Sequence, residues 1–315
     1  MLDIRFLGSG GGMPMPNRHL SSLLISFRGR TILFDCGEGT QVAMRKFKTG
    51  FKTIDIICIS HVHGDHLYGL PGLLSTMGNS ERTEMVTLIG PRGFRNFMDK
   101  ILFLVPNLPF PVRIIEGGGG PLIFRLEEDR LLFQEKLDKY KENLTIDTLE
   151  LDHSTECLGY SLTLNRRPKF LVEKAEEYDI PKNFWKRLQN GETISYKDRE
   201  YCPELVLGEE RSGIKISYIT DSRPVGGIVD FINKSKLFIC EGSYGDDADL
   251  HKAIKNKHMT FREAAKLALE GQVEELILTH FSPSMDEPSE FIHNARESFA
   301  NTSLAYDGLS KTIGF

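Results

Sequence analysis

Short runs of apolar and β-branched residues recur along the chain, and each is followed by a polar or ionisable residue. Runs such as TILF (31–34) and LFIC (237–240) show no alternation of polar and apolar positions, which is typical of strands buried on both faces. Such strands belong to layered α/β proteins, in which functional sites gather where strand ends meet loops. The ionisable residues that follow six of these runs are Asp35, His61, His153, Asp221, Glu241 and His280.

Amphipathic segments lie between the predicted strands. Residues 38–49 and 260–272 have the spacing of helices that bury one face. In the second segment, Thr260 is the predicted N-cap, Glu263 completes a capping box and Gly271 marks the end. The glycine run at 116–120 is predicted to be a flexible turn. We therefore expect one layered α/β domain that covers residues 1–315.

Residues 162–213 interrupt this pattern and are predicted to project from the domain. They are polar and contain three prolines, and residues 165–187 carry seven Lys or Arg against four Asp or Glu. Phe170, Phe184 and Trp185 are interleaved with these charges. Such a segment can bind nucleic acid through phosphate contacts and base stacking, or it can be a solvated helical hairpin.

Composition narrows the class of protein only a little. The chain has 315 residues and a formal net charge of −5, which does not indicate a general nucleic-acid binder, although a local basic patch can serve that purpose. We see no secretory signal and no apolar run long enough to cross a membrane. The five scattered cysteines include no CxxC pair, so we expect a reducing, cytoplasmic environment rather than a disulfide framework.

The segment SHVHGDHLYGLPG (60–72) carries the candidate chemistry. It places four potential metal ligands within six positions, and imidazole with carboxylate suits zinc, manganese or iron. Four ligands so close in sequence cannot all reach one ion, so we expect two ions, with further ligands from the strand ends. Taken singly, the distant ligands are equally consistent with surface or capping residues. The predicted sets are His61, His63 and His153 on one ion and Asp65, His66 and His280 on the other, with Asp221 bridging both.

Together these motifs resemble those of a known family. Metallo-β-lactamase fold hydrolases have a similar pattern, which consists of HxHxDH, a histidine before GY, an aspartate after a strand and a late histidine after LT. Five further segments extend the resemblance to the ribonuclease Z family, which trims the 3′ trailer from precursor tRNA. These segments are FLGSGGGMPMPNRHLSS, FDCGEGTQ, DHSTECLGY, YITDSRP and NKHMT. The resemblance implies an αββα sandwich with a flexible inserted arm, two metal ions, zinc before manganese or iron, and a homodimer.

The resemblance also assigns roles to individual residues. A metal-bound hydroxide attacks the phosphodiester and leaves a 3′-hydroxyl on the tRNA. Asp65 is implied as general base as well as ligand, and His258 in NKHMT as the group that stabilises or protonates the leaving oxygen. Glu241 would hydrogen-bond His258, fix its tautomer and raise its pKa. Spacing alone favours an exposed residue just before a helix for His258, and the family resemblance reverses that preference.

The glycine-rich segment after the first strand is a second candidate for substrate contact. Backbone N–H groups in such a loop can bind phosphate, and Arg18 is the expected phosphate partner, although the loop could also be a plain turn.

Two features depart from the family. HFSPSMDEP lacks the Arg and Tyr that often follow the last ligand, and the arm lacks a Gly-Pro-rich tip.

Two other functions remain open at this point. A metal-dependent phosphodiesterase acting on small or cyclic nucleotides would use the same ligands, but it would not need an arm. An inactive RNA-binding subunit would keep the arm, but decayed enzymes commonly lose ligands, and all seven are present. We therefore expect a precursor-tRNA endoribonuclease that has no contact with membranes.

Overall fold

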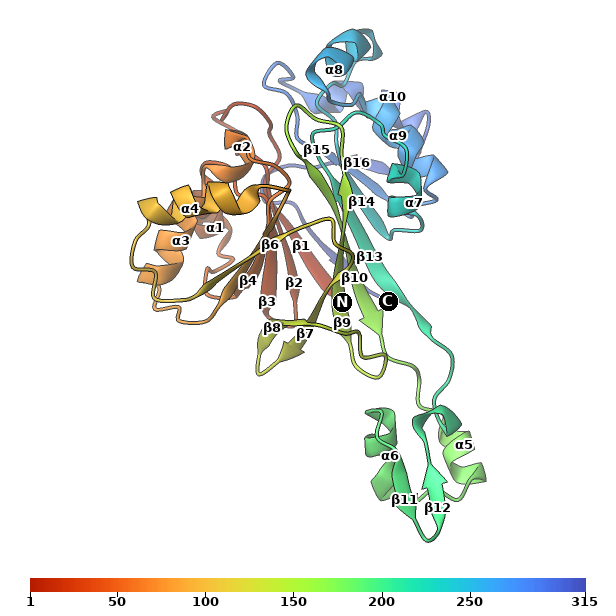
Figure 1. Cartoon of the computed structure of the whole chain (residues 1–315). Helices are drawn as coiled ribbons and strands as arrows, with labels where there is room; N and C mark the ends of the chain where they lie inside the picture. The colour runs from red at the N-terminus through yellow and green to blue at the C-terminus, as the bar shows by residue number, and fades with distance from the viewer.

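Two large β-sheets face each other in the computed structural model, which describes all residues from Met1 to Phe315. Apolar side chains from both inner faces form one core, with Phe6 and Ile56 from the first sheet and Leu162 and Ile216 from the second. Helices cover both outer faces (Figure 1). The predicted αββα sandwich is confirmed.

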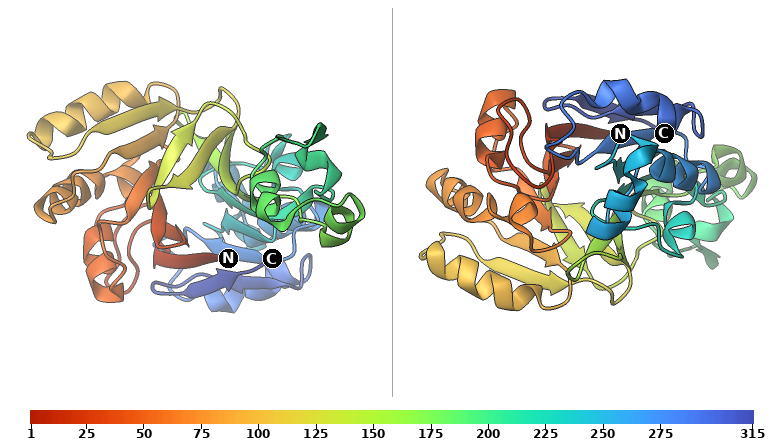
Figure 2. Two further views of the ribbon diagram at one scale, coloured as in Figure 1. Left: turned by 90° about the horizontal axis from the view of Figure 1, so that it is seen from below. Right: turned by 90° about the horizontal axis from the view of Figure 1, so that it is seen from above.

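The first sheet has seven strands and carries the N-terminal half of the site. Strands β3 to β6 run parallel, so their C-terminal ends lie along one edge. The last strand, β17, pairs with β1, which brings the two termini together (Figure 2). The strand order is β17 (Ser310–Ile313), β1 (Leu2–Gly8), β2 (Ser22–Phe27), β3 (Arg30–Phe34), β4 (Ile54–Cys58), β5 (Val86–Gly90) and β6 (Val112–Glu116).

The second sheet has eight strands and carries the other half of the site. Strands β13 to β16 run parallel, and β10 pairs antiparallel with β13. The strand order is β16 (Thr302–Leu304), β15 (Leu276–Thr279), β14 (Leu237–Glu241), β13 (Arg211–Ile219), β10 (Leu158–Arg166), β9 (Asn143–Glu150), β7 (Leu122–Glu127) and β8 (Arg130–Gln134).

The outer helices bury one face each against their sheet. In α9 the Thr260 side chain accepts from the Glu263 N–H and the Glu263 side chain accepts in return, so the predicted capping box is confirmed. No helix has both the length and the apolar character that crossing a bilayer requires. The helices are α1 (Thr40–Phe47), α2 (Gly64–Leu67), α3 (Leu70–Asn79), α4 (Phe94–Leu104), α7 (Ile228–Ile232), α8 (Leu250–Asn256), α9 (Phe261–Glu270) and α10 (Ile292–Arg296), with 3₁₀ turns at Asp247–Asp249 and Pro288–Phe291.

Residues 167–210 form a small unit that projects from the sandwich (Figure 1). It contains α5 (Val172–Glu177), α6 (Lys182–Gln189), the hairpin β11 (Ile194–Tyr196) and β12 (Arg199–Tyr201), and a 3₁₀ turn at Pro203–Leu205. We call this unit the arm. The range 162–213 expected from the sequence also takes in the end of β10 and the start of β13, because these two strands stay paired to Arg166 and Arg211.

The aromatic side chains of the arm are structural. Phe170, Phe184 and Trp185 pack against the arm's own core, which includes Ala175, Ile180, Leu188, Ile194, Tyr201 and Val206. The Trp185 indole N–H donates to the Ile180 carbonyl at 2.9 Å. These partly buried rings thus help to form the core that so small a segment needs, and their stacking on bases stays a prediction.

A buried charge cluster joins the two sheets at the start of β4. The carboxylate of Asp55 accepts from Arg30 Nε at 2.7 Å and from Arg82 Nη2 at 3.0 Å, and both Asp55 and Arg82 are almost completely buried. Asp55 Oδ2 also accepts from the Leu131 N–H of β8 at 2.9 Å. One carboxylate thus links β3, β4 and β8 at the end of β4 opposite to His61.

Candidate metal centre and active site

The HxHxDH segment leaves the C-terminal end of the fully buried strand β4. His61 follows Ser60, His63 is the N-cap of the short helix α2, and Asp65 and His66 lie within that helix. His61 and His66 have no exposed surface. The segment thus contains one turn of helix, which separates His61 and His63 from Asp65 and His66.

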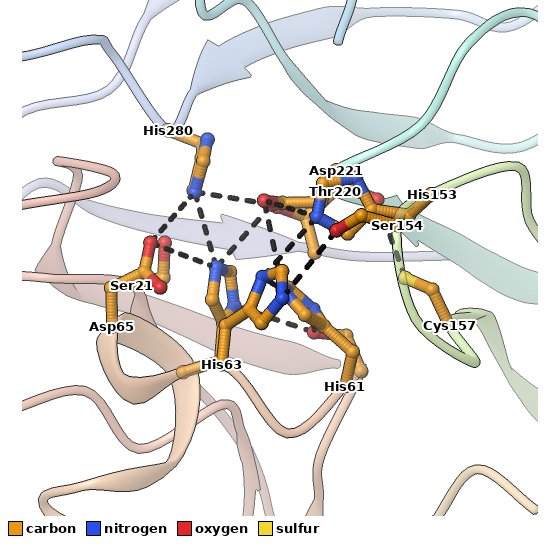
Figure 3. Close-up of polar contacts among 12 residues, drawn as sticks. Ser21, His61, His63, Asp65, His153, Ser154, Cys157, Thr220, Asp221 and His280 are labelled. Atoms are coloured by element: carbon orange, nitrogen blue, oxygen red, sulfur yellow. Dashed lines mark hydrogen bonds and ion pairs between the residues drawn. The ribbon is translucent and has the colours of Figure 1, made fainter. Parts of the chain in front are cut away.

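Three imidazoles converge in the first group of potential ligands. His61 Nε2 lies 3.1 Å from His63 Nδ1, and His153 Nε2 lies 3.3 Å from the same atom. His153 comes from the loop between β9 and β10, so the group joins the two halves of the molecule. Figure 3 shows the three rings side by side.

The second group combines two histidines and two carboxylates. His280 Nε2 lies 3.1 Å from Asp221 Oδ1 and 3.1 Å from His66 Nε2, and Asp65 Oδ2 lies 3.3 Å from His66 Nε2. The other oxygen of Asp221, Oδ2, is 3.7 Å from both His61 and His153 (Figure 3). The structure therefore brings together the same two sets that the sequence predicted, with Asp221 between them.

The donor atoms of both groups suit divalent cations. His66 Nδ1 lies 2.9 Å from Asp35 Oδ2, and His280 Nδ1 lies 3.1 Å from Ser243 Oγ. These contacts place the ring protons on Nδ1 and leave two Nε2 lone pairs facing each other, an arrangement that a shared cation stabilises. Oxygen and imidazole donors of this kind are ligands of zinc, manganese and iron.

The site also concentrates negative charge. Burial raises the pKa of Asp221, but His280, His66 and His61 hold it well below its usual value. Burial likewise raises the pKa of Asp65, but His66 and His280 lower it overall. Both carboxylates are therefore ionised near neutral pH and present charge that a cation neutralises.

Three site residues have a strained backbone. Asp35, Asp221 and His280 have φ of 56°, 45° and 57°, and they are the buried residues among the non-glycine positions with positive φ. Each lies just after the end of a strand, β3, β13 or β15. A non-glycine residue in this conformation costs about 1 to 3 kcal/mol, and such strain clusters at functional sites. The backbone here turns the side chains into the space between the sheets.

Asp35 organises one side of the site, a role that sequence reasoning missed. Its Oδ2 accepts from Tyr218 OH at 2.8 Å and from Ser60 Oγ at 3.0 Å, besides the contact with His66 Nδ1. Its Oδ1 accepts from the Ser60 N–H at 2.7 Å. One feature of the sequence could have predicted this role. Asp35 follows a buried strand, as several of the predicted ligands do.

His258 and Glu241 form a pair beside the second group. His258 Nδ1 lies 3.2 Å from Glu241 Oε2, and Glu241 is fully buried at the end of β14. Burial lowers the pKa of His258, but the Glu241 carboxylate raises it to about 9. The His258 ring stacks on His280 with a centroid separation of 5.6 Å. Glu241, His258 and His280 are also close enough together to form a third potential metal group.

A polar cavity of about 430 Å³ opens onto these residues. One wall is the glycine-rich segment at residues 8–12, which begins at the end of β1 and which we call the glycine loop. There the Gly12 N–H donates to Asp65 Oδ2 at 2.7 Å. The end of α8 forms another wall with Lys255, Asn256 and Lys257. No apolar side chain lines the cavity, which suits a charged substrate.

Curated relatives identify the family of the chain. The ribonuclease Z of Alkaliphilus oremlandii (strain OhILAs) is 57% identical over 315 residues, and the match covers 100% of this chain and 99% of the relative. The chain belongs to the ribonuclease Z family. A family described as "Anti-Pycsar protein Apyc1" also matches residues 2–102, about the first third of the chain.

Solved structures agree with this family and with its fold. Human tRNase Z, short form, superposes with a TM-score of 0.66 at 25% identity, covering 99% of this chain and 100% of that one. YhfI from Bacillus subtilis, described as a metallo-β-lactamase fold protein, gives a TM-score of 0.68 at 17% identity and covers 98% of each chain. This ribonuclease Z family member has the metallo-β-lactamase fold.

Arg18 has a different place in this ribonuclease Z family member from the one expected. Its Nη2 donates to the carbonyls of Met285 and Asp286 at 2.9 and 3.1 Å, and its guanidinium lies over the Phe281 ring. These bonds fix the loop after His280, the segment that lacks the expected Arg and Tyr. Arg18 therefore supports the loop and is not free in the cavity.

Proposed function

We propose that the chain is a metal-dependent endoribonuclease that removes the 3′ trailer from precursor tRNA and leaves a 3′-hydroxyl. The observation that carries this proposal is the pair of ligand groups sharing Asp221 in a polar cavity, within a chain that is 57% identical over its full length to a ribonuclease Z. We take the cofactors to be two divalent ions, zinc before manganese or iron. When bound, such ions supply hydroxide near neutral pH and neutralise charge on the attacking and leaving oxygens.

Asp65 is proposed to orient and deprotonate the attacking water. The Gly12 N–H holds one carboxylate oxygen at 2.7 Å, which limits rotation of the side chain. The lowered pKa of Asp65 keeps the carboxylate ionised and able to accept a hydrogen bond from water. The glycine loop thus supports the proposed base directly, in addition to any contact with phosphate.

His258 is proposed to give a proton to the 3′ oxygen of the tRNA as it leaves. Its pKa of about 9 keeps the ring protonated near neutral pH, and Glu241 holds Nδ1 so that Nε2 is free to donate. General acid catalysis of this kind contributes about 10² to 10⁴ in rate. The leaving oxygen belongs to the nucleotide upstream of the cut. The bound tRNA would therefore extend out of the cavity on the side of α8.

Lys255 is proposed to bind a phosphate of that upstream strand. Lys257 Nζ is occupied by Asp152 Oδ1 at 2.7 Å and by the His153 carbonyl at 3.0 Å. Lys255 also lines the cavity, is exposed, and makes no ion pair. A lysine that faces a polyanion gains affinity by releasing counterions.

The arm is proposed to hold the tRNA away from the cleavage site. Strand β13, with nine residues from Arg211 to Ile219, separates the base of the arm from the site by roughly 30 Å. The arm has eight Lys or Arg and ten Asp or Glu, so it is not basic as a whole. The cations Lys182, Lys186 and Arg187 gather on α6, which is the helix we propose faces RNA.

A homodimer in the cytoplasm is proposed as the working form. The distance between arm and site supports a dimer, since the arm of one subunit could hold the tRNA that its partner cleaves. Val42, Phe97, Phe103 and Leu104 are exposed on the helices that cover the first sheet, where a second copy could bury them. All five cysteines are free thiols, as a reducing compartment allows. Sedimentation equilibrium tests the dimer, and a monomer at micromolar concentration would contradict it.

The decisive experiment is cleavage of a precursor tRNA that carries a 3′ trailer, with Zn²⁺ or Mn²⁺ added and the product ends mapped. We expect one cut after the discriminator base and a 3′-hydroxyl on the tRNA. Hydrolysis of a small chromogenic phosphodiester without cleavage of the precursor would contradict the tRNA substrate and favour a small nucleotide instead. Binding of the precursor without hydrolysis of either substrate would indicate an inactive RNA-binding subunit.

A further inference from the structure

Ser243 lies at the junction of the metal ligands and the His258–Glu241 pair. It follows β14 by two residues and is 3% exposed. Its hydroxyl oxygen lies 2.6 Å from Glu241 Oε2, 3.1 Å from His280 Nδ1 and 3.3 Å from His258 Nδ1. One hydroxyl therefore touches a predicted ligand, a predicted acid and the carboxylate that holds that acid.

A count of protons decides the direction of these bonds. The hydroxyl has one proton, and two acceptors compete for it, Glu241 Oε2 at 2.6 Å and the His280 carbonyl at 3.1 Å. The shorter bond to the charged oxygen is the stronger one, so Ser243 donates to Glu241. The His258 Nδ1–H is taken by Glu241, whose two oxygens lie 3.2 and 3.3 Å away. The Ser243 oxygen, whose lone pairs are free, then accepts from the His280 Nδ1–H.

We propose that Ser243 is a positioning residue that sets the metal ligand His280 and the proposed acid His258 through the same hydroxyl. By accepting from Nδ1 it fixes the His280 tautomer in which Nε2 points at Asp221 and Asp65. By donating to Glu241 it holds the carboxylate that orients His258. The part concerning His258 rests on the proposed function, whereas the part concerning His280 requires only that the second group binds metal.

The opposite side of the site contains a parallel arrangement. There Ser60 Oγ lies 3.0 Å from Asp35 Oδ2 and 3.0 Å from His61 Nδ1, and the same carboxylate oxygen accepts from His66. Each sheet thus supplies a serine–carboxylate pair behind its histidines. Partners of this kind orient ligands, and their loss commonly costs 10- to 100-fold in metal affinity or activity.

The test compares Ser243→Ala and Ser243→Thr with the wild-type protein, with Ser161→Ala as control. Ser161 is a buried strand serine whose hydroxyl bonds only Ser217, so its loss reports the general cost of removing a buried hydroxyl. Zn²⁺ affinity is measured by competition with a chelator, and kcat and KM are measured on precursor tRNA. For Ser243→Ala we expect about 10- to 100-fold loss in both Zn²⁺ affinity and kcat with KM unchanged. We expect recovery in Ser243→Thr and wild-type values in Ser161→Ala.

The outcomes separate this proposal from the proposed function. Unchanged Zn²⁺ affinity in Ser243→Ala would overturn the proposal, and so would equal losses in Ser161→Ala or no recovery in Ser243→Thr. If the wild-type protein does not cleave precursor tRNA, the proposed function fails, yet the chelator titration still tests the link to His280. Should Ser243→Ala not fold, Ser243→Cys is nearly isosteric but a weak hydrogen-bonding group, and we expect it to lose affinity as Ala does.

Discussion

Gly11 packs directly against the imidazole of His280. A Cβ added to Gly11 would lie 2.3 Å from Cε1 and 2.4 Å from Nε2 of that ring, closer than any real contact. Gly11→Ala should therefore displace either the glycine loop or His280. A shift of about 1 Å at a reacting centre can cost 10²-fold, and we expect about that loss in kcat on precursor tRNA. Gly119→Ala, where nothing lies within 4 Å, is the matched control and should behave as wild type.

Asp65→Asn should remove the proposed base and keep the size of the side chain. We expect cleavage of precursor tRNA to fall by about 10² to 10⁴, since the amide cannot accept a proton from water. Single-turnover rates and metal content should be measured on the same sample. A variant that retains both metals and near wild-type turnover would refute the base role, whereas loss of metal would show that ligation dominates.

His258→Ala should lower kcat by about 10² to 10⁴ and leave metal content unchanged, because the proposed acid donates a proton and does not bind metal. His251→Ala, an exposed histidine on α8 that bonds only the Ala248 carbonyl, is the control. Atomic absorption on both variants provides the check. A His258→Ala protein that loses metal would instead assign His258 to the third group with Glu241 and His280.

Lys255→Ala should weaken tRNA binding by one phosphate contact. We expect the slope of log affinity against log salt to fall by about 0.7, the value for one contact on a single strand. The inhibition constant of trailer-free tRNA, measured across salt concentrations, reports this slope. Lys252→Ala on the same helix is the control, because Lys252 already pairs with Asp249 at 2.7 Å. If the loss appeared only with substrates that carry long trailers, the upstream assignment would be wrong.

Lys182→Glu with Lys186→Glu should raise KM for precursor tRNA at least tenfold, because each reversal replaces attraction to phosphate with repulsion. Hydrolysis of a small chromogenic phosphodiester should not change, since the arm base is roughly 30 Å from Asp221. Glu173→Gln with Glu176→Gln on α5 is the control and should not raise KM. Equal losses on both substrates would mean that α6 supports the sandwich and does not bind tRNA.

The sequence alone predicted site residues wherever a potential metal ligand follows the end of a predicted strand. Each predicted ligand comes from a motif or a strand end, so the two groups could be assembled before the fold was known. The Thr260–Glu263 capping box was equally accessible, because it depends on residues three positions apart.

The remaining features depend on contacts that periodicity does not encode. The Gly12–Asp65 bond joins residues 53 positions apart, and the packing of Trp185 depends on a small core formed by four separate elements. Ser243 and Asp35 belong to common residue types, and only their neighbours in space distinguish them. Arg18 was assigned to phosphate because its carbonyl partners, more than 260 positions away, could not be foreseen.

The buried Asp55 cluster has a consequence for how the protein survives the loss of its ions. The ligand groups join the two sheets at one end, and Asp55 joins β3 and β4 to β8 at the other. Chelation removes only the link at the ligand end, while the apolar core between the sheets and the Asp55 cluster still hold them in register. We expect an apoprotein that takes up metal again without refolding, so that a cell can change the ion in this enzyme during the lifetime of a single molecule.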